Sequence, residues 1–191
     1  MSNIHMHQMF TCAAISTKLN LDLHQYCEDV YNNSKKNGFN RSNINGWQSH
    51  DIKDEVSKDL VNAINMLSQT YKSTVHLNKN LKISNMWINR NSPNSYNKEH
   101  IHPGCIFGGV YYITVPENSG KIKFITPAEH MVYDWPAEYF DKYNEFNSDI
   151  WWLPVEENFL YIFPSWMKHE VTMNKSNETR ISISFNVVID D

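Results

Sequence analysis

Three histidines have the spacing of a metal site. His100 and His102 are two residues apart in a segment that reads as a β-strand, and His169 stands at the start of a later segment of the same kind. Because alternate residues of a strand face the same side, the first pair can direct both imidazoles at one ion. Three ligands leave coordination positions open for substrate and oxygen, as at non-haem iron centres. Imidazole also suits zinc, copper and nickel, so the histidines alone do not select the metal.

The other histidines do not share this arrangement. His5 and His7 repeat the His-x-His spacing, but we expect them in a frayed terminus. The nearest carboxylate to the His100 pair is Glu99, and strand alternation places it on the opposite face. The remaining histidines are interpreted as ordinary surface or capping residues, namely His24, His50, His76 and His130.

Periodicity predicts the elements that would position these residues. Apolar residues recur at helical steps over 19–35 and again over 51–74, where Asp51 is a candidate N-cap. After about residue 80 the period changes to two, which indicates short strands. We place these strands near 81–90, 98–103, 106–115, 120–126, 150–154, 158–163, 168–173 and 179–189. Two helices followed by about eight strands predict an α+β protein whose core is a jelly roll, or double-stranded β-helix, with N-terminal supporting helices.

The length of 191 residues fits a single domain. Within residues 1–191 we expect 1–80 to be mainly helical support and 81–191 to be the jelly-roll core. The stretch 127–149 contains several aromatic residues and no clear period. Connections of this length are often functional lids.

Composition and charge bear on the partners and the location of the protein. The net charge of −4 gives no broad attraction to phosphate backbones, so we do not expect a nucleic-acid partner. No apolar run is long enough for a membrane span, and the first residues lack the pattern of a signal peptide. The three cysteines have neither a disulfide framework nor zinc-finger spacing. We therefore expect a cytoplasmic protein, and the sequence indicates no oligomeric state.

Four short segments occur in a definite order around the histidines in the sequence. Ile88-Asn89-Arg90 precedes the His100 pair, and Val110-Tyr111-Tyr112-Ile113 follows it. The segment from Phe163 to Val171 contains His169, and Arg180-Ile181-Ser182 comes after it. In this order the segments resemble the prolyl-hydroxylase-like members of the 2-oxoglutarate and Fe(II)-dependent oxygenases. The resemblance spans roughly residues 43–187.

A further block, Asn45-Gly46-Trp47-Gln48-Ser49, is similar to a small bacterial and phage branch of that superfamily, which has an HxH…H metal motif. The resemblance implies Fe(II) bound by His100, His102 and His169. It implies a dioxygenase that consumes O2 and 2-oxoglutarate, releases succinate and CO2, and hydroxylates a small molecule or peptide. The open substrate classes are a prolyl residue, an amino acid and another small metabolite. The implied 2-oxoglutarate-binding residues are Arg180, Ser182, Tyr112 and Asn89.

Physical chemistry gives these roles a reason. Arg180 could pair with the distal carboxylate of 2-oxoglutarate through charge-assisted hydrogen bonds. Ser182, two residues on and facing the same side, could add a hydroxyl hydrogen bond. In the alternative interpretation, Arg180 faces solvent, and Ile181 faces inward together with the other apolar residues on its side of the strand. Asn89 could equally satisfy the end of a strand.

The position of His102 departs from most of the superfamily, which has Asp or Glu there. Three neutral imidazoles give an Fe(II) site a formal charge of +2 instead of +1, which strengthens Coulomb attraction for an anionic co-substrate. Two alternatives stay open. One is a cupin-like three-histidine dioxygenase without 2-oxoglutarate, although such cupins usually have a Glu after the His-x-His pair and 103–109 contains none. The other is a non-catalytic jelly-roll binding module.

Several neighbouring residues are assigned structural roles at this stage. Pro103-Gly104 is expected to form the turn after the metal strand. Cys105 is expected to be a small buried residue. The three tryptophans near the site are expected to pack in the interior rather than to contact a ligand, namely Trp87, Trp151 and Trp152.

Overall fold

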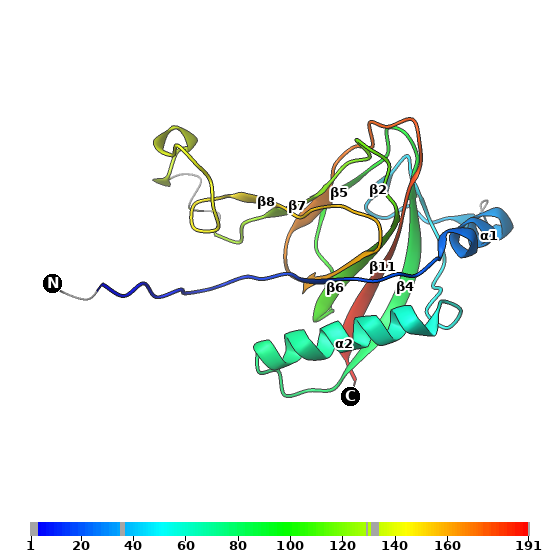
Figure 1. Ribbon diagram of the computed structural model, residues 1–191, viewed down its shortest axis with the longest axis horizontal. Coiled ribbons are helices and arrows are strands. Elements are labelled where there is room, and N and C mark those ends of the chain that lie inside the picture. The colour runs from blue at the N-terminus through cyan, green and yellow to red at the C-terminus, as the bar shows by residue number, and fades with distance from the viewer. Residues whose placement is uncertain (1–3, 35–36, 129, 131–133, 191) are drawn as a thin grey trace.

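Two antiparallel β-sheets face each other in the computed structural model, which describes residues 4–34, 37–128, 130 and 134–190 (Figure 1). One sheet has the order β1-β9-β6-β11-β4-β3 and the other has the order β2-β5-β10-β7-β8. The helices are α1 (His24–Ser34), α2 (Lys58–Thr74) and the short 3-10 helix η2 (Ala137–Tyr139). The strands are β1 (Ile15–Lys18), β2 (Asn43–Ile44), β3 (Trp47–Gln48), β4 (Leu81–Asn91), β5 (Tyr96–His100), β6 (Phe107–Thr114), β7 (Ile122–Ile125), β8 (Ile150–Trp152), β9 (Phe159–Pro164), β10 (His169–Val171) and β11 (Arg180–Ile189).

The eight strands from β4 to β11 form the predicted double-stranded β-helix. They divide into two groups of four neighbours, β9-β6-β11-β4 and β5-β10-β7-β8. The short strands β1, β2 and β3 extend the edges of these sheets, and the sequence did not predict them. The N-terminal part therefore adds strands as well as helices to the core.

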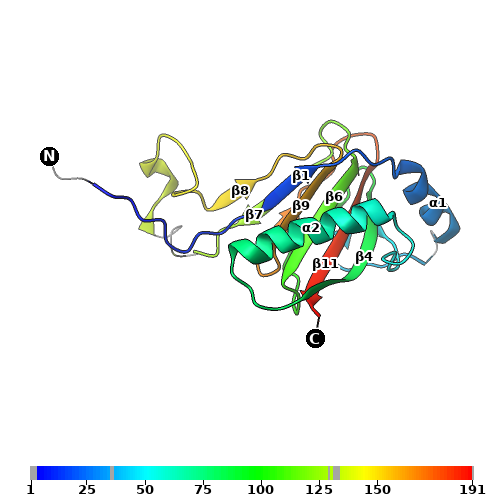
Figure 2. The ribbon, with the colours of Figure 1, turned by 60° about the horizontal axis from the view of Figure 1, so that its bottom comes forward.

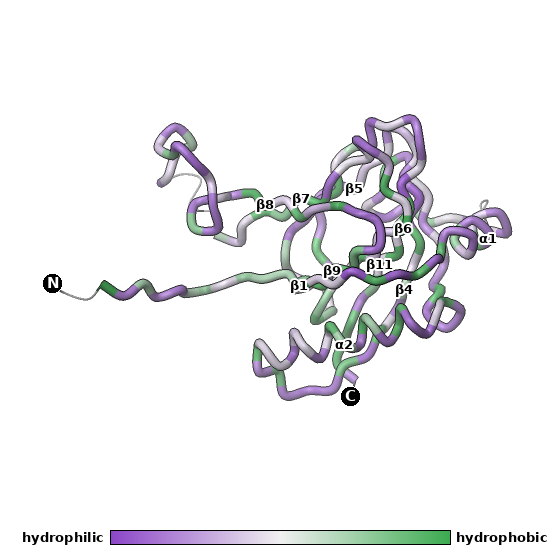
Figure 3. Tube along the Cα trace, viewed as in Figure 1, coloured by the Kyte–Doolittle hydropathy of each residue, from purple (hydrophilic) through white to green (hydrophobic). Residues whose placement is uncertain are grey.

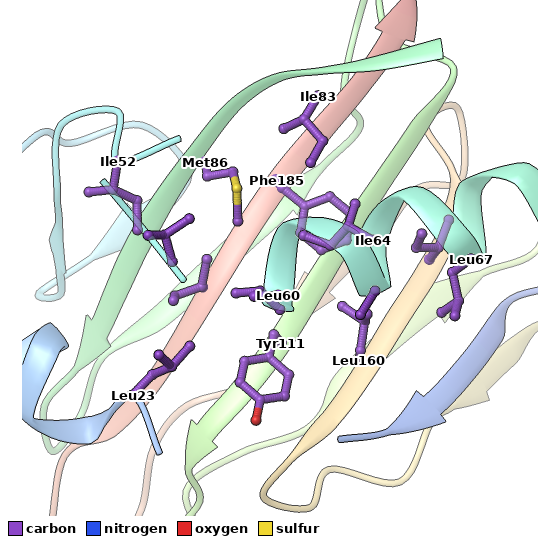
Figure 4. Close-up of a cluster of buried hydrophobic side chains, with 14 of the residues drawn as sticks. Leu23, Ile52, Leu60, Ile64, Leu67, Ile83, Met86, Tyr111, Leu160 and Phe185 are labelled. Atoms are coloured by element: carbon purple, nitrogen blue, oxygen red, sulfur yellow. The ribbon is translucent and has the colours of Figure 1, made fainter. Parts of the chain in front are cut away.

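Helix α2 covers the outer face of the larger sheet and crosses its strands obliquely (Figure 2). Its buried stripe includes Leu60, Ile64 and Leu67, and these pack against apolar residues of the sheet such as Phe185 and Leu160 (Figure 4). The hydropathy of the chain alternates along α2 accordingly (Figure 3). This packing leaves the opposite face of the sheet to line the space between the two sheets.

Both predicted helices begin later than expected. Helix α1 starts at His24 instead of residue 19, and α2 starts after the N-cap Ser57, whose hydroxyl accepts from the Asp59 amide. Asp51 is not an N-cap, because its Oδ1 accepts from the Met86 amide at 2.9 Å and from the Lys53 amide at 3.0 Å. Ile52 is buried although it lies before the helix, so its spacing in the sequence reflects burial and not membership of the helix.

The described residues of the segment 127–149 project away from the sandwich (Figure 1). Its described aromatic residues include Trp135 and Tyr139, which are exposed. None of its described residues lines the main cavity, so a lid role stays a prediction, and residues 129 and 131–133 lie outside the described part of the chain. No described helix has the length and apolar content that a bilayer span requires.

Candidate metal centre and anion pocket

The smaller sheet brings two of the three predicted histidines together, and the segment after β5 supplies the third. His100 ends β5, His169 begins β10, and the two are paired across the ladder. The ring centroids of His100 and His169 are 4.3 Å apart, and those of His102 and His169 are 5.1 Å apart. One ligand atom from each imidazole lies within 4.8 Å of the others. His5 and His7 are exposed and outside this cluster.

His102 reaches the cluster by a different route from the one predicted. Strand β5 ends at His100, so strand alternation does not orient His102. Instead, the His102 amide donates to the Ser165 carbonyl at 2.9 Å, which ties this segment to the end of β9. Pro103 and Gly104 form the expected turn just beyond, and Gly104 has a φ of 77°. Glu99 is exposed, and its carboxylate lies 3.6 Å from the Lys168 ammonium. It is not part of the histidine cluster, although it lines the cavity beside that cluster.

Hydrogen bonds fix the same tautomer in all three rings. Nδ1 of His100 donates to the Lys98 carbonyl at 2.6 Å, and Nδ1 of His169 donates to the Met167 carbonyl at 2.8 Å. Nδ1 of His102 bonds to a side-chain oxygen. Because carbonyl and amide oxygens only accept, Nδ1 carries the proton in each ring and Nε2 presents a lone pair.

The donor set fits a metal ion. Nε2 of His102 and Nε2 of His169 are 3.3 Å apart, and with both protons on Nδ1 neither nitrogen can donate to the other. Two facing lone pairs repel unless a cation lies between them. Imidazole–metal bonds of about 2.0–2.1 Å place two ligands of one ion about 3 Å apart, which matches this spacing. Neutral imidazoles suit Fe(II), although they also suit other divalent metals.

Burial keeps these imidazoles neutral. It lowers the pKa of His100 and of His102, and in both cases it is the largest cause of the shift. Burial, followed by the charge of His100, lowers the pKa of His169 to about 3. Because metal ligands must be deprotonated, the site is ready to bind an ion at neutral pH.

These shifts predict how the metal-free protein responds to acid. The unfolded chain has histidine pKa values near 6.5, so it binds protons before the folded triad does. The stabilising contribution of His169 is therefore complete above about pH 6.5 and is lost as pH falls toward the folded-state value of about 3. Urea unfolding between pH 7.5 and pH 4.5 should show a shallower loss of stability for His169→Ala than for the wild type. Parallel pH dependences would contradict the shift.

A cavity of about 510 Å³ opens beside the triad, between the two sheets. Its wall on the larger sheet is a row of polar side chains in register. Ser182 of β11 pairs with Tyr112 of β6 on one side and with Asn89 of β4 on the other. Gln48 of β3 pairs with Asn89 and extends the row. All four residues line the cavity and are buried.

Arg180 stands at the far end of this wall with an unsatisfied charge. It is 2% exposed, so the alternative in which it faces solvent is wrong, and the apolar residues Ile181 and Ile183 face the α2 side instead. Its Nη1 donates to the Ser119 carbonyl at 2.8 Å, while its Nε has no partner. Among the described residues no carboxylate forms an ion pair with it. An isolated buried guanidinium is costly, so this end of the cavity fits an anion.

Neighbouring polar groups suit the same anion. Burial raises the pKa of Tyr112 to about 12, which keeps its hydroxyl protonated and able to donate. Asn89 donates from Nδ2 to the Ser184 hydroxyl at 2.9 Å, and it faces the cavity. The residues predicted from the sequence for co-substrate binding therefore line one cavity with the triad.

Three structural expectations were wrong. Trp87 is only half-buried, lines the cavity and stacks on His102 with ring centroids 6.2 Å apart. Trp151 and Trp152 are 47% and 45% exposed on β8, so they do not pack in the interior. Cys105 is half-buried rather than buried.

Two cavity residues of β11, Ser184 and Asn186, were not predicted from the sequence. The signal was present, because every second residue from Arg180 is polar while the residues between them are apolar. Following the alternation past Ser182 would have placed both on the cavity face.

Comparison with known proteins agrees with this combination of fold and site. The family model described as "Putative 2OG-Fe(II) oxygenase" matches residues 85–186, just over half of the chain. The chain therefore belongs to this 2-oxoglutarate and Fe(II)-dependent oxygenase family, and it is an oxygenase-type protein with the three-histidine motif. Among curated protein sequences, none matches it.

Solved structures with the same fold are distant in sequence. A prolyl-4-hydroxylase from Pseudomonas putida is 12% identical with a TM-score of 0.64, and the match covers 95% of each chain. The non-haem alpha ketoglutarate dependent carbocyclase SnoK from nogalamycin biosynthesis is 12% identical with a TM-score of 0.67, covering 94% of this chain and 81% of that one. A collagen prolyl hydroxylase of Paramecium Bursaria Chlorella virus-1 is 14% identical with a TM-score of 0.56, covering 91% and 94%. At these identities the likeness shows the fold alone.

Proposed function

We propose that this protein is a non-haem Fe(II), 2-oxoglutarate-dependent dioxygenase that hydroxylates a small molecule or a peptide. One observation carries the proposal: a buried arginine without a carboxylate partner among the described residues opens onto the same cavity as three converging imidazoles. A dicarboxylate that chelates a metal through one end and meets a guanidinium at the other would satisfy both. Membership of the oxygenase family supports the same conclusion.

Each residue would have a defined task. His100, His102 and His169 would hold the iron through Nε2, and Arg180 would pair with the distal carboxylate of 2-oxoglutarate. Ser182 and Tyr112 would donate hydroxyl hydrogen bonds to that carboxylate, and Asn89 would face the co-substrate from the neighbouring strand. Bound iron and 2-oxoglutarate would supply the oxidising chemistry, in which O2, 2-oxoglutarate and a substrate C–H bond give succinate, CO2 and an alcohol. The sheets would exclude bulk water from it.

The test is co-substrate turnover. Purified protein with Fe(II), 2-oxoglutarate and O2 should release succinate, slowly without substrate and faster when a peptide or metabolite library contains the substrate. Fe(II)-dependent O2 consumption that ignores 2-oxoglutarate would favour the three-histidine dioxygenase that needs no co-substrate. Binding of a library ligand without any Fe(II)-dependent reaction would favour a non-catalytic binding module.

We also propose a cytoplasmic location, because Cys12, Cys27 and Cys105 are all free.

Replacing the unusual ligand makes a specific prediction. His102→Asp should retain Fe(II) in about equimolar amounts, because a carboxylate and an imidazole are both acceptable at that corner of the site. Metal analysis after anaerobic loading and gel filtration measures this. Loss of iron from a variant with a wild-type circular dichroism spectrum would contradict the placement of His102.

A further inference from the structure

One replaceable side chain hydrogen-bonds to the His102 ring nitrogen Nδ1. This nitrogen lies 2.5 Å from Oδ1 of Asn186, which belongs to β11. The other two imidazoles donate instead to backbone carbonyls, those of Lys98 and Met167, which no side-chain substitution removes. His102 also lies beyond the end of β5, where strand geometry does not orient it. The Nδ1 hydrogen bond of His102 therefore depends on a side chain, whereas those of the other two imidazoles depend on the backbone.

Asn186 is itself held in place. Its Nδ2 donates to Oδ1 of Asn85 at 3.1 Å, and the same Oδ1 accepts from the Ser84 hydroxyl at 2.9 Å. The register between β11 and β4 shifts after Asn186, since Asn186 pairs with Asn85 while the next residue pairs with Ile83. Such bulges redirect side chains near functional sites. Because Nδ2 is committed to Asn85, the oxygen of the amide is the atom that faces His102.

The strand β6, which pairs with β11 beside Asn186, leaves room for the His102 ring. Gly108 of β6 is the residue paired with Asn186. A Cβ at Gly108 would lie 3.3 Å from both Cγ and Cδ2 of His102 and 3.1 Å from the Phe163 ring. A glycine here leaves the imidazole room to lie against the strand while its Nδ1 meets the asparagine.

We propose that Asn186 is a positioning residue for the metal ligand His102. Its Oδ1 accepts a hydrogen bond from Nδ1–H of His102 and thereby keeps the Nε2 lone pair of that ring directed at the ion. This inference rests on the proposed function, because it concerns how the metal site is assembled. A neutral amide makes the imidazole less basic than a carboxylate partner would. In a site with three neutral ligands, a carboxylate at position 186 would add a negative charge close to the ion and strengthen binding of the cation.

The experiment compares Fe(II) affinity in three variants and the wild type, by anaerobic competition with a chromophoric chelator. Asn186→Leu should weaken Fe(II) binding by about 10- to 100-fold, because the acceptor is lost at nearly constant volume. Asn186→Asp should bind at least as tightly as the wild type. Asn97→Leu is the matched control, since Asn97 also lines the cavity but bonds to Asn91 and Ser42. Its Fe(II) affinity should be unchanged.

A second measurement separates orientation from packing. In metal-free protein with ¹⁵N-labelled histidine, the ring nitrogen shifts of His102 should report the Nδ1–H form in the wild type and in Asn186→Asp. They should report a mixture of tautomers in Asn186→Leu. Wild-type affinity and an unchanged tautomer in the leucine variant would overturn the proposal. Weaker Fe(II) binding by Asn186→Asp than by the wild type would also overturn it. This second comparison can be made even if the leucine variant does not fold.

Failure of the proposed function gives a different result. A wild-type protein that binds no Fe(II) contradicts the metal site itself. The tautomer measurement then decides the role of Asn186 without any metal: Nδ1–H in the wild type that is lost in Asn186→Leu supports the positioning of the ring. A wild-type His102 that carries its proton on Nε2 overturns it.

Discussion

His169→Ala is expected to abolish Fe(II) retention. His169 is 3% exposed, and its ring centroid lies 4.3 Å from that of His100 and 5.1 Å from that of His102. No other described residue belongs to this ligand cluster, so none can replace its Nε2. Loss of an outer hydrogen-bond partner of a metal ligand already costs about 10- to 100-fold in affinity, and loss of a ligand should cost more. The metal content after anaerobic loading and gel filtration should fall from about one ion per chain to a background value.

The control for this prediction is His50→Ala. His50 is exposed and its ring packs edge-on against Phe39, away from the triad. This variant should keep the wild-type metal content. If His169→Ala retained stoichiometric iron, or if both variants lost it equally, the triad would not be the metal site.

Arg180→Met is expected to raise the concentration of 2-oxoglutarate needed for half-saturation by about 30-fold or more. Removing one partner of a buried charge pair costs about 2–5 kcal/mol, and each 1.4 kcal/mol is a factor of ten in affinity. Fe(II) content should stay at the wild-type level, because Arg180 is not among the metal ligands. Titration of Fe(II)-loaded protein with 2-oxoglutarate under anaerobic conditions measures the change.

The same variant also tests whether Arg180 has a structural role. Its charge has no carboxylate partner among the described residues, and burial lowers its pKa, so the ligand-free protein gains little from the guanidinium. The free energy of unfolding without ligand should therefore not decrease. Arg90→Met is the contrasting variant, because Arg90 pairs with Glu28 and lies over the Tyr31 ring, and it should lose stability without a change in 2-oxoglutarate binding. The reverse pattern would contradict the anion pocket.

The sequence predicted the fold because the period of its apolar residues changes once, near residue 80. The alternation in β11 marks two buried faces, one against α2 and one toward the cavity. Strand spacing puts Arg180 and Ser182 on the same face, whereas their proposed role came from the resemblance to the oxygenase family. Helix boundaries were less predictable. Ile52 has helical spacing and is buried, but the carboxylate of Asp51 bonds to the Met86 amide and holds that segment in a turn.

Parts of the site depend on contacts that sequence spacing does not encode. His102 was assigned to a strand, yet its position comes from a backbone bond to Ser165 and a side-chain bond to Asn186. Trp87 was assigned to the core because tryptophan usually is buried, but its strand face is the cavity face. Trp151 and Trp152 are exposed because β8 is an edge strand that no described element covers. For His102 a partner distant in the chain decided the outcome, and for Trp151 and Trp152 the absence of one among the described residues did so.

The most direct measurement is a crystal structure of the protein grown without oxygen in the presence of Mn(II), as a stand-in for Fe(II), and 2-oxoglutarate. We predict a single anomalous peak within bonding distance of Nε2 of His100, His102 and His169. We also expect the co-substrate to extend from that ion to the guanidinium of Arg180. Metal bound elsewhere, or an occupied metal position with nothing against Arg180, would contradict the proposed site.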